Sequence, residues 1–314
     1  MFNLAISVFT MNKINLFFQL TKFRLTLTVV FSAIAGYLLG LNDFSLNSQV
    51  DLLLLVIGGF CVTGSANAFN QILERDYDRM MKRTSNRPLA MKKISVLHSV
   101  FFASILSILG IFLLFIINPY CSLFGSISIL IYVLFYTPLK RFSSFSIFVG
   151  AIPGALPFLI GWVAAYDYSL LNSSIPSGFE LDSGALFAMQ FFWQFPHFIA
   201  IAWVQDKDYK QAGFKMMIGE KKGNVAAFSA IVSTILLIVC SISPYMYEMN
   251  KLDMSYYTLL LVLLLGAWFL YFSIKLLVDH EDSSARKLMF SSFIYLPLLQ
   301  TILILDKYFL NTSL

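Results

Sequence analysis

The chain has 314 residues, of which 58% are hydrophobic and 12% charged, and its mean hydropathy is +0.76. Soluble globular proteins have roughly 25% charged residues, so this composition excludes a soluble fold and predicts a chain that crosses a membrane several times. The net charge of +5 requires no nucleic-acid partner, because the basic residues follow the membrane topology described below.

Nine apolar segments are long enough to cross about 30 Å of hydrocarbon. No linker or low-complexity segment separates them, so we expect an all-α bundle that forms a single domain over residues 1–314. The predicted spans are residues 25–42, 50–73, 97–117, 121–138, 143–163, 183–204, 225–247, 257–278 and 288–310.

The distribution of basic residues predicts the orientation of these spans. If the N-terminus is inside, every Lys and Arg except Lys251 and Lys307 falls in an inner segment. The outer loop of residues 164–182 has no basic residue. Cytoplasmic loops are enriched in Lys and Arg. We therefore expect the N-terminus in the cytoplasm and the C-terminus on the outer face.

The second span ends in an unusually charged stretch, NAFNQILERDYDRMMKRTSNRPL, residues 67 to 89. Asn70, Glu74 and Asp78 recur every four residues, which places them on one helix face. That face lies at the cytoplasmic end of the helix, where free carbonyl groups carry partial negative charge. The Glu74 and Asp78 carboxylates repel each other and this helix end. A divalent cation would relieve the repulsion, and ligands that offer only oxygen suit Mg²⁺.

Basic residues follow directly, and Lys82, Arg83 and Arg87 could hold the phosphate groups with which Mg²⁺ shares its ligands. Asp76 lies off the acidic face, so we expect it to pair with a nearby basic residue. The alternative is an interfacial helix end whose charges only pair with one another. Asn70 favours a functional site, because it lies deeper in the span, where polar groups are costly.

The fourth span ends in YTPLKR, residues 136 to 141. Lys140 and Arg141 add two cations, and Tyr136 a hydroxyl group, to the inner surface that is predicted to bind phosphate. The alternative is an ordinary basic anchor at the cytoplasmic end of a membrane helix.

The sixth span carries polar groups deep in an aromatic sequence, FFWQFPHFIAIAW, residues 191 to 203. Gln190, Gln194 and His197 follow helical spacing, and a histidine within a membrane is costly unless it has a partner. We therefore predict that Gln194, His197 and Trp203 contact a substrate. A satisfied structural histidine is the alternative.

The same helix face is predicted to continue to Asp208, eleven residues after His197. Asp206 and Asp208 would then lie at the cytoplasmic C-terminal end of this span. The sixth span has the same direction as the second, which suggests two repeated bundles with one acidic helix end each, meeting at a central cavity.

Together these stretches resemble the protoheme IX farnesyltransferase (heme O synthase) family of the intramembrane UbiA-type prenyltransferase superfamily. The resemblance rests on NQILERDYDRMMKRTSNRPL, YTPLKR, GAIPGALPFLIGW and FFWQFPHFIAIAW with DYKQAGFKMM. It implies a helical bundle with a central cavity open to the cytoplasmic side, in a bacterial inner membrane. It also implies Mg²⁺-dependent transfer of the farnesyl group of farnesyl diphosphate to a vinyl group of heme B, giving heme O and diphosphate.

The resemblance further implies roles for individual residues. Asn70, Glu74 and Asp78 match the first metal–diphosphate motif, and Asp208 matches the second acidic region and would also hold metal. His197 matches the histidine of the heme branch. The matching diphosphate-binding positions are Arg83, Arg87, Lys140 and Arg141. Heme A synthase or terminal-oxidase assembly proteins would be the partners downstream.

Two positions depart from the family pattern. Val204 and Ile201 stand where relatives that prenylate quinone precursors carry aspartate, which favours the heme branch and leaves a second metal site open. Phe23 stands where many members have proline.

Three other functions remain open on the sequence. The first is a prenyltransferase for an aromatic quinone precursor, which shares the first acidic motif. The second is a secondary transporter for an anion, since acidic helix ends fit a cation-coupled carrier. The third is a non-catalytic protein that binds heme.

Overall fold

The computed structural model describes residues 15–42, 45–166, 181–219, 221–247, 249 and 251–310, and every regular element in these ranges is helical. Nine helices in the described ranges are long and apolar enough to cross a membrane, which confirms the predicted all-α polytopic class. The N-terminus, most of the outer loop and the last four residues lie outside the described ranges.

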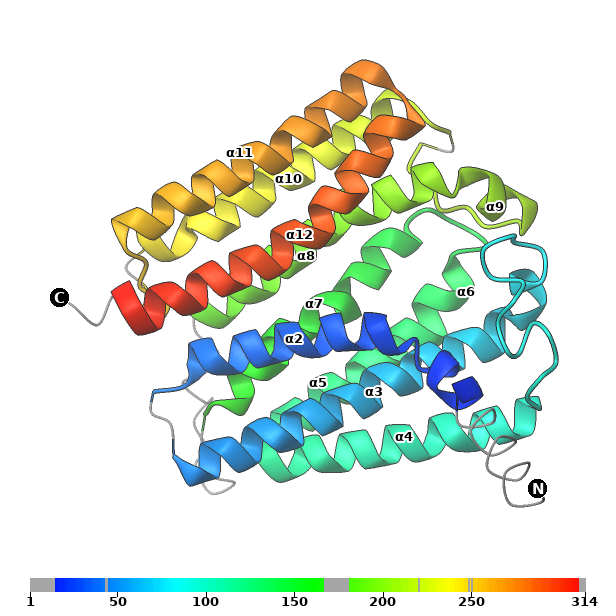
Figure 1. The fold of residues 1–314 in the computed structure, drawn as a ribbon, viewed down its shortest axis with the longest axis horizontal. Helices are drawn as coiled ribbons and strands as arrows, with labels where there is room; N and C mark the ends of the chain where they lie inside the picture. Colours follow the sequence, from blue (N-terminus) through cyan, green and yellow to red (C-terminus); the bar gives the residue numbers. More distant parts are fainter. Residues whose placement is uncertain are drawn as a thin grey trace, which may run out of the picture.

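Helices that follow one another in the chain pack side by side, as α3 does with α4 and α10 with α11 (Figure 1). The bounds are α2 Phe23–Gly40, α3 Leu46–Asp78, α4 Val96–Ile117, α5 Pro119–Leu130, the π-helix η1 Ile131–Tyr136, α6 Thr137–Leu139, α7 Ser146–Ala164, α8 Leu181–Val204, α9 Asp206–Gln211, α10 Asn224–Met246, α11 Tyr256–Asp279, α12 Asp282–Leu305 and the π-helix η2 Asp306–Leu310.

The second span is the element that departs most from its predicted bounds. The prediction ended it at residue 73, but α3 continues to Asp78. The additional turns carry Glu74 and Asp78 on the same helix as Asn70, which confirms the predicted shared helix face. The rigid helix therefore fixes the spacing of these three side chains.

The described residues form three hydrophobic clusters, and α2 and α7 both contribute to the two larger ones. One of these two joins side chains of α8, α10, α11 and α12 with Phe158 and Trp162 of α7. The other joins α2, α3, α4 and α5 with Leu156 and Ile160 of α7. The two larger clusters divide the helices into two groups, with α7 at their boundary (Figure 1).

Glycines allow α2 and α7 to approach each other closely. A Cβ atom on Gly161 would lie 1.8 Å from the carbonyl oxygen of Ala33, and one on Gly36 would lie 2.0 Å from that of Phe158. Small residues at such crossings let membrane helices pack backbone against backbone. This contact fixes the C-terminal half of α2 against α7.

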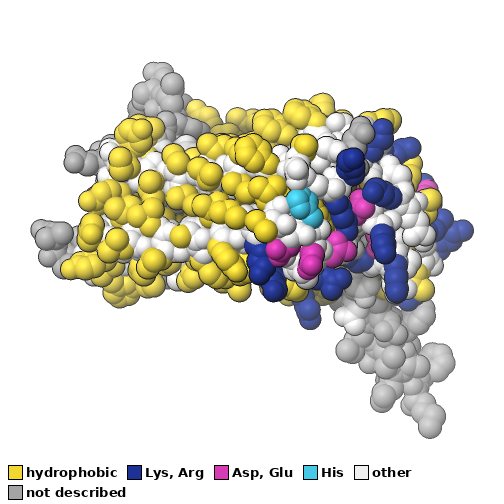
Figure 2. Space-filling view, turned by 90° about the horizontal axis from the view of Figure 1, so that it is seen from above, with side chains coloured by type: hydrophobic (Ala, Val, Ile, Leu, Met, Phe, Trp, Pro, Cys, Tyr) yellow, Lys and Arg dark blue, Asp and Glu magenta, His cyan; other side chains and the backbone are white. Residues whose placement is uncertain are grey.

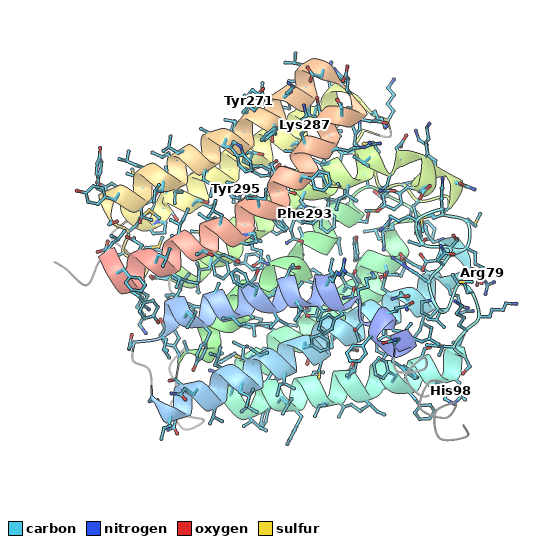
Figure 3. The ribbon with its side chains drawn as sticks, in the orientation of Figure 1. Arg79, His98, Tyr271, Lys287, Phe293 and Tyr295 are labelled. Atoms are coloured by element: carbon cyan, nitrogen blue, oxygen red, sulfur yellow. The ribbon has the colours of Figure 1, made fainter. Side chains whose placement is uncertain are left out.

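On the face shown in Figure 2, charged side chains gather at one end of the molecule, and hydrophobic side chains are spread over the rest. Arg79 and His98 lie at that end (Figure 3), next to the start of α4. The long apolar surface is what contact with lipid requires, and the charged end matches the predicted inner side.

Candidate active site

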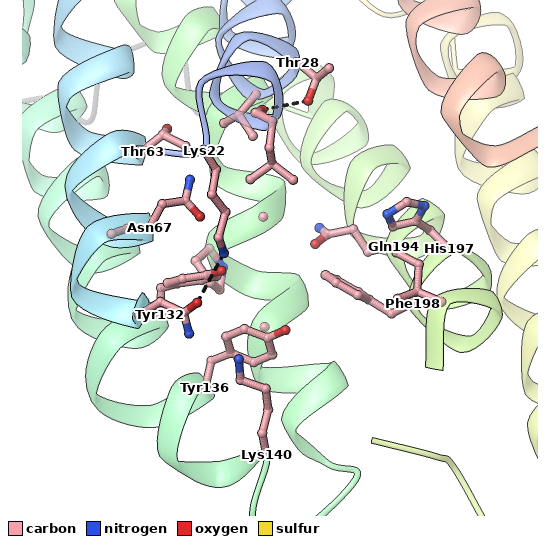
Figure 4. A pocket seen from close by; sticks show the side chains of 18 of the residues that line it. Lys22, Thr28, Thr63, Asn67, Tyr132, Tyr136, Lys140, Gln194, His197 and Phe198 are labelled. Atoms are coloured by element: carbon pink, nitrogen blue, oxygen red, sulfur yellow. Dashed lines mark hydrogen bonds between the residues drawn. The ribbon is translucent and has the colours of Figure 1, made fainter. Parts of the chain in front are cut away.

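A pocket of about 340 Å³ lies between α2, α3, η1, α7, α8 and α12. Its charged end is formed by α3, the loop after α3 and Lys140. Its apolar end is formed by α2, α7, α8 and α12. Figure 4 shows two facing walls of the pocket. Lys22, Asn67 and the tyrosines lie on one wall, and Gln194, His197 and Phe198 lie on the other.

The predicted acidic face of α3 lines the charged end of this pocket. Asn70, Glu74 and Asp78 are all buried and all contribute to the lining. Glu74 forms an ion pair with Lys140, and both Asp78 oxygens accept hydrogen bonds from Arg87 at 2.7 and 2.8 Å. Two cations thus neutralise the two carboxylates within the pocket.

Asp76 points away from this face, as its position in the helix predicted. It is exposed and forms an ion pair with Arg79 at 3.0 Å. This confirms the expected role of Asp76 as a partner of a nearby basic residue.

Lys22 is a site residue that the sequence analysis missed. Its ammonium group donates to the Oδ1 atom of Asn70 at 3.2 Å, and its side chain reaches into the pocket between α2 and α3 (Figure 4). Lys22 precedes α2 with φ at 49°, which is uncommon for a residue other than glycine. Burial, followed by repulsion from Arg87, lowers the pKa of Lys22 to about 7.

Polar side chains of α3 hold the turn that carries Lys22. Asn67 donates to the carbonyl oxygen of Thr21 at 3.3 Å, and Gln71 donates to those of Gln19 and Leu20. The sequence offered one signal for this site residue, a lysine at the start of the first span, which is predicted to be cytoplasmic. Without the tertiary contacts, that signal is indistinguishable from an ordinary membrane anchor.

The loop after α3 contributes a second set of basic groups. Arg83 and Arg87 line the pocket, whereas Lys82 is exposed and does not. The backbone N–H of Arg83 donates to Asp208 at 3.2 Å. Asp208 therefore contacts this loop, although it does not itself line the pocket.

The fourth span enters the site through a π-helix. Directly after η1, at the start of α6, the Thr137 hydroxyl donates to the carbonyl oxygen of Tyr132 five residues earlier, at 2.8 Å, and accepts from Asn70 at 3.1 Å. The wider turn brings the rings of Tyr132 and Tyr136 to 5.0 Å from each other, and both line the pocket. Such π-helical turns often occur at functional sites.

Lys140 and Arg141 take different positions after this turn. The ammonium group of Lys140 lies 4.5 Å from the centre of the Tyr136 ring and lines the pocket. Burial acts to lower the pKa of Lys140, but the Glu74 carboxylate outweighs it, and the net shift is upward. The Arg141 guanidinium instead lies 4.6 Å from the centre of the Tyr77 ring and does not line the pocket.

The opposite wall comes from α8. Gln190, Gln194 and His197 all line the pocket, and Trp193 stacks on the His197 ring with 4.6 Å between the ring centres. The Nε2 atom of Gln194 donates to the carbonyl oxygen of Ala151 in α7 at 2.9 Å. Trp203 is fully buried in the core on the other side of α8, so the structure does not bring it to this pocket.

The prediction of one continuous helix face from Gln190 to Asp208 is wrong. Helix α8 ends at Val204, and Gln205 has non-helical torsion angles before α9 begins at Asp206. Asp206 and Asp208 therefore lie in the first turn of α9, where the helix dipole favours negative charge, and not at the end of α8. The break turns Asp208 toward the loop that carries Arg83.

Aromatic residues far apart in the sequence complete the lining. They are Tyr209, Phe214, Phe198 and Phe293. Phe293 and Tyr295 leave α12 on different sides (Figure 3): the ring of Phe293 lies 4.9 Å from that of His197, and Tyr295 stacks on Phe269 of α11. Sequence reasoning could not select these residues, because the chain contains 32 Phe and 15 Tyr.

The oxygen atoms of Asn70, Glu74 and Asp78 fit Mg²⁺ in their chemistry. Within the described ranges, no three His, Cys, Asp or Glu side chains come together in a way that could hold a metal ion. A cation here would take further ligands from phosphate oxygens, which is the usual mode of Mg²⁺ in phosphoryl sites.

Comparison with known proteins identifies the protein family to which the chain belongs. Residues 29–296 match the model of the UbiA prenyltransferase family. The fold is similar to a structure of digeranylgeranylglyceryl phosphate synthase, with a TM-score of 0.75 and 22% identity over 94% of this chain and 98% of that one. It is also similar to a UbiA homologue from Archaeoglobus fulgidus bound to DMAPP and Mg²⁺, with a TM-score of 0.67 and 15% identity over 92% and 98% of the two chains. The chain therefore belongs to the UbiA prenyltransferase family of integral-membrane enzymes.

Sequence relatives narrow the class to one kind of enzyme. The chain is 44% identical to the protoheme IX farnesyltransferase of Flavobacterium psychrophilum, over 94% of this chain and 95% of the relative. It is 43% identical to that of Flavobacterium johnsoniae, over 93% and 94%. The human mitochondrial protoheme IX farnesyltransferase is 33% identical over 92% of this chain and 61% of its own length.

Proposed function

We propose that this protein transfers the farnesyl group of farnesyl diphosphate to a vinyl group of heme B, with addition of water, giving heme O and diphosphate. The observation that carries the proposal is the division of one pocket into two chemical halves. Buried cations and carboxylates form one end, and aromatic side chains with a histidine form the other. An isoprenyl diphosphate has the same two halves.

The charged end would bind the diphosphate. Lys22, Arg83, Arg87 and Lys140 line it, and Lys140 and Arg87 can exchange their carboxylate partners for phosphate oxygens. Asn70, Glu74 and Asp78 would hold Mg²⁺, with Asp208 placed to add a ligand after a movement of the Arg83 loop. When bound, Mg²⁺ supplies positive charge that stabilises the departing diphosphate.

The reaction would begin when the bond between C1 of the farnesyl chain and the diphosphate oxygen breaks. The diphosphate leaves with the electron pair, and the cations of the charged end stabilise the negative charge that develops on it. The π faces of Tyr132, Tyr136 and Phe198 would stabilise the allylic cation. A heme vinyl carbon then bonds to C1, and the resulting cation takes up water and loses one proton, giving the hydroxyl group.

The remaining predicted residues would act at the edge of the site. Lys82 and Arg141 would attract the diphosphate as it approaches, since both are basic and lie outside the lining. Gln194 and His197 would contact the heme. Trp203 would support the wall formed by α8 from behind, because it packs in the core.

We further propose that the chain forms one domain in a bacterial inner membrane, with a cytoplasmic N-terminus, an outer C-terminus and a pocket that opens to the cytoplasmic side. Its product would pass to heme A synthase or to proteins that assemble terminal oxidases. The charged end of the surface and the positions of Lys251 and Lys307 at the opposite end support this orientation.

Mass spectrometry of heme extracted from cells with and without the protein tests the proposal. We expect a farnesylated, hydroxylated heme only where the chain is produced. Purified protein should release diphosphate from farnesyl diphosphate when heme B is present and not when an aromatic quinone precursor replaces it. Release of diphosphate with the quinone precursor and not with heme B would show that heme B is not the acceptor.

A further inference from the structure

Ser292 of α12 contacts both His197 and Trp193 of α8. Its hydroxyl oxygen lies 2.8 Å from the Nδ1 atom of His197, and its carbonyl oxygen accepts a hydrogen bond from the Nε1 atom of Trp193 at 2.9 Å. Trp193 in turn stacks on the imidazole ring, with 16° between the planes. One fully buried residue thus holds the histidine by its edge and supports the indole that covers its face.

The hydrogen bonds of Ser292 determine which nitrogen of His197 carries a proton. The Ser292 hydroxyl lies 2.6 Å from the carbonyl oxygen of Met289, a distance at which the hydroxyl must donate, because a carbonyl oxygen has no proton. A hydroxyl has only one proton. Ser292 therefore accepts from His197, and the proton between them belongs to Nδ1.

In this tautomer Nε2 of His197 carries a free electron pair. Nδ1 carries the one hydrogen bond that the described residues give this ring, so Nε2 has no partner among them, and the ring lines the pocket. Aromatic rings surround it, since the Phe293 and Phe198 rings lie 4.9 and 5.5 Å from it between ring centres. The lone pair is thus the polar group of an otherwise aromatic wall.

We propose that Ser292 is a positioning residue that holds His197 as the Nδ1–H tautomer and thereby presents the Nε2 lone pair as a ligand for the heme iron. The inference rests on the proposed function, since heme is its acceptor substrate. Histidines that bind metal almost always donate their other nitrogen to a protein acceptor, which fixes the ring and raises the basicity of the ligand. Ser292 is such an acceptor, and Trp193 prevents rotation of the ring.

Titration of the purified full-length protein with ferric heme tests this role. The absorbance maximum of the heme and its electron paramagnetic resonance spectrum report axial ligation by a nitrogen. Ser292→Ala should weaken heme binding by about 10-fold to 100-fold and reduce the nitrogen-ligated signal. His197→Ala should abolish that signal, and added imidazole should restore it.

Two variants separate positioning from a general effect on packing. Ser292→Thr keeps the hydroxyl group and should retain binding. Ser291→Ala removes a neighbouring buried hydroxyl that donates only to Leu288, so heme binding should not change. Binding of farnesyl diphosphate at the other end of the pocket serves as the check on folding, and it should be the same in all four variants.

Unchanged heme affinity and spectrum in Ser292→Ala would overturn the inference, as would an equal loss in Ser291→Ala. A wild-type spectrum without nitrogen ligation would overturn it as well. If the wild-type protein ligates heme through His197 and yet forms no heme O from farnesyl diphosphate, the positioning role stands and the proposed function fails.

Discussion

The ammonium group of Lys140 forms an ion pair with the carboxylate of Glu74 and lies over the Tyr136 ring, 4.5 Å from its centre. Glu74 lies in α3 and Lys140 directly after α6, so the pair joins the second span to the fourth. Both side chains are buried. Removal of either one leaves the other as a largely buried charge without its partner.

The first prediction concerns this pair. We expect Glu74→Gln and Lys140→Met each to destabilise the protein by about 3–5 kcal/mol, because each leaves a buried charge unpaired. In the double variant, the free energy of unfolding should fall by less than the sum of the two single losses. Unfolding in detergent, measured for all four proteins, gives the interaction energy. Strictly additive losses would contradict the pairing.

The same variants should separate stability from activity. Lys140→Met should lower kcat by about 100-fold or more, since it removes a charge that stabilises the departing diphosphate. The double variant should remain as inactive as the single one even where its stability recovers. Release of diphosphate is the measurement.

The second prediction concerns Asp78. Asp78→Asn keeps the shape of the side chain and removes its charge, so we expect lower activity and a higher Mg²⁺ concentration for half-maximal rate. Asp76→Asn is the matched control, because Asp76 lies on the same helix, is exposed and, among the described residues, pairs with Arg75 and Arg79 alone. It should retain full activity. An inserted, folded Asp78→Asn protein with full activity at low Mg²⁺ would exclude Asp78 as a metal ligand.

The third prediction follows from the low pKa of Lys22, which burial and then Arg87 lower from 10.5 to about 7. In the folded protein Lys22 is neutral above about pH 7, whereas in the unfolded chain it stays protonated up to about 10.5. A bound diphosphate would raise this pKa again, so binding should take up a proton above pH 7. The affinity for farnesyl diphosphate should therefore fall as the pH rises above 7.

Calorimetry in buffers with different ionisation enthalpies measures this proton uptake. Lys22→Arg stays charged at every relevant pH and should lose this part of the pH dependence. Lys22→Met should bind more weakly and without the uptake. Proton uptake that is the same in Lys22→Arg and the parent would assign it to another group.

The fourth prediction concerns the contact between α2 and α7. Gly161→Ala would place a Cβ atom 1.8 Å from the carbonyl oxygen of Ala33, so the two helices must separate. We expect the free energy of unfolding to fall by about 1–3 kcal/mol or more. Gly184→Ala is the control, because no atom lies within 4 Å of its Cβ position in α8, and it should be neutral or stabilising by up to about 1 kcal/mol. Thermal unfolding distinguishes the two.

Particular residues show how far sequence reasoning reaches in this protein. The acidic face of α3 could be predicted, because Asn70, Glu74 and Asp78 belong to one helix and their spacing alone sets their direction. Lys22 could not be selected, because its role depends on hydrogen bonds from Asn67 and Gln71, which lie in another helix. The position of Asp208 was wrong because the extrapolated helix ends at Val204.

The sequence by itself determined the membrane class, the nine apolar spans found in the described ranges, and the acidic face of α3. Each depends on composition or on regular spacing within one segment, which lipid and helix geometry impose locally. Only the tertiary structure decided which cation faces which carboxylate, which aromatic rings line the pocket, and that Ser292 holds His197. These contacts join residues far apart in the chain, and their formation depends on how the helices pack.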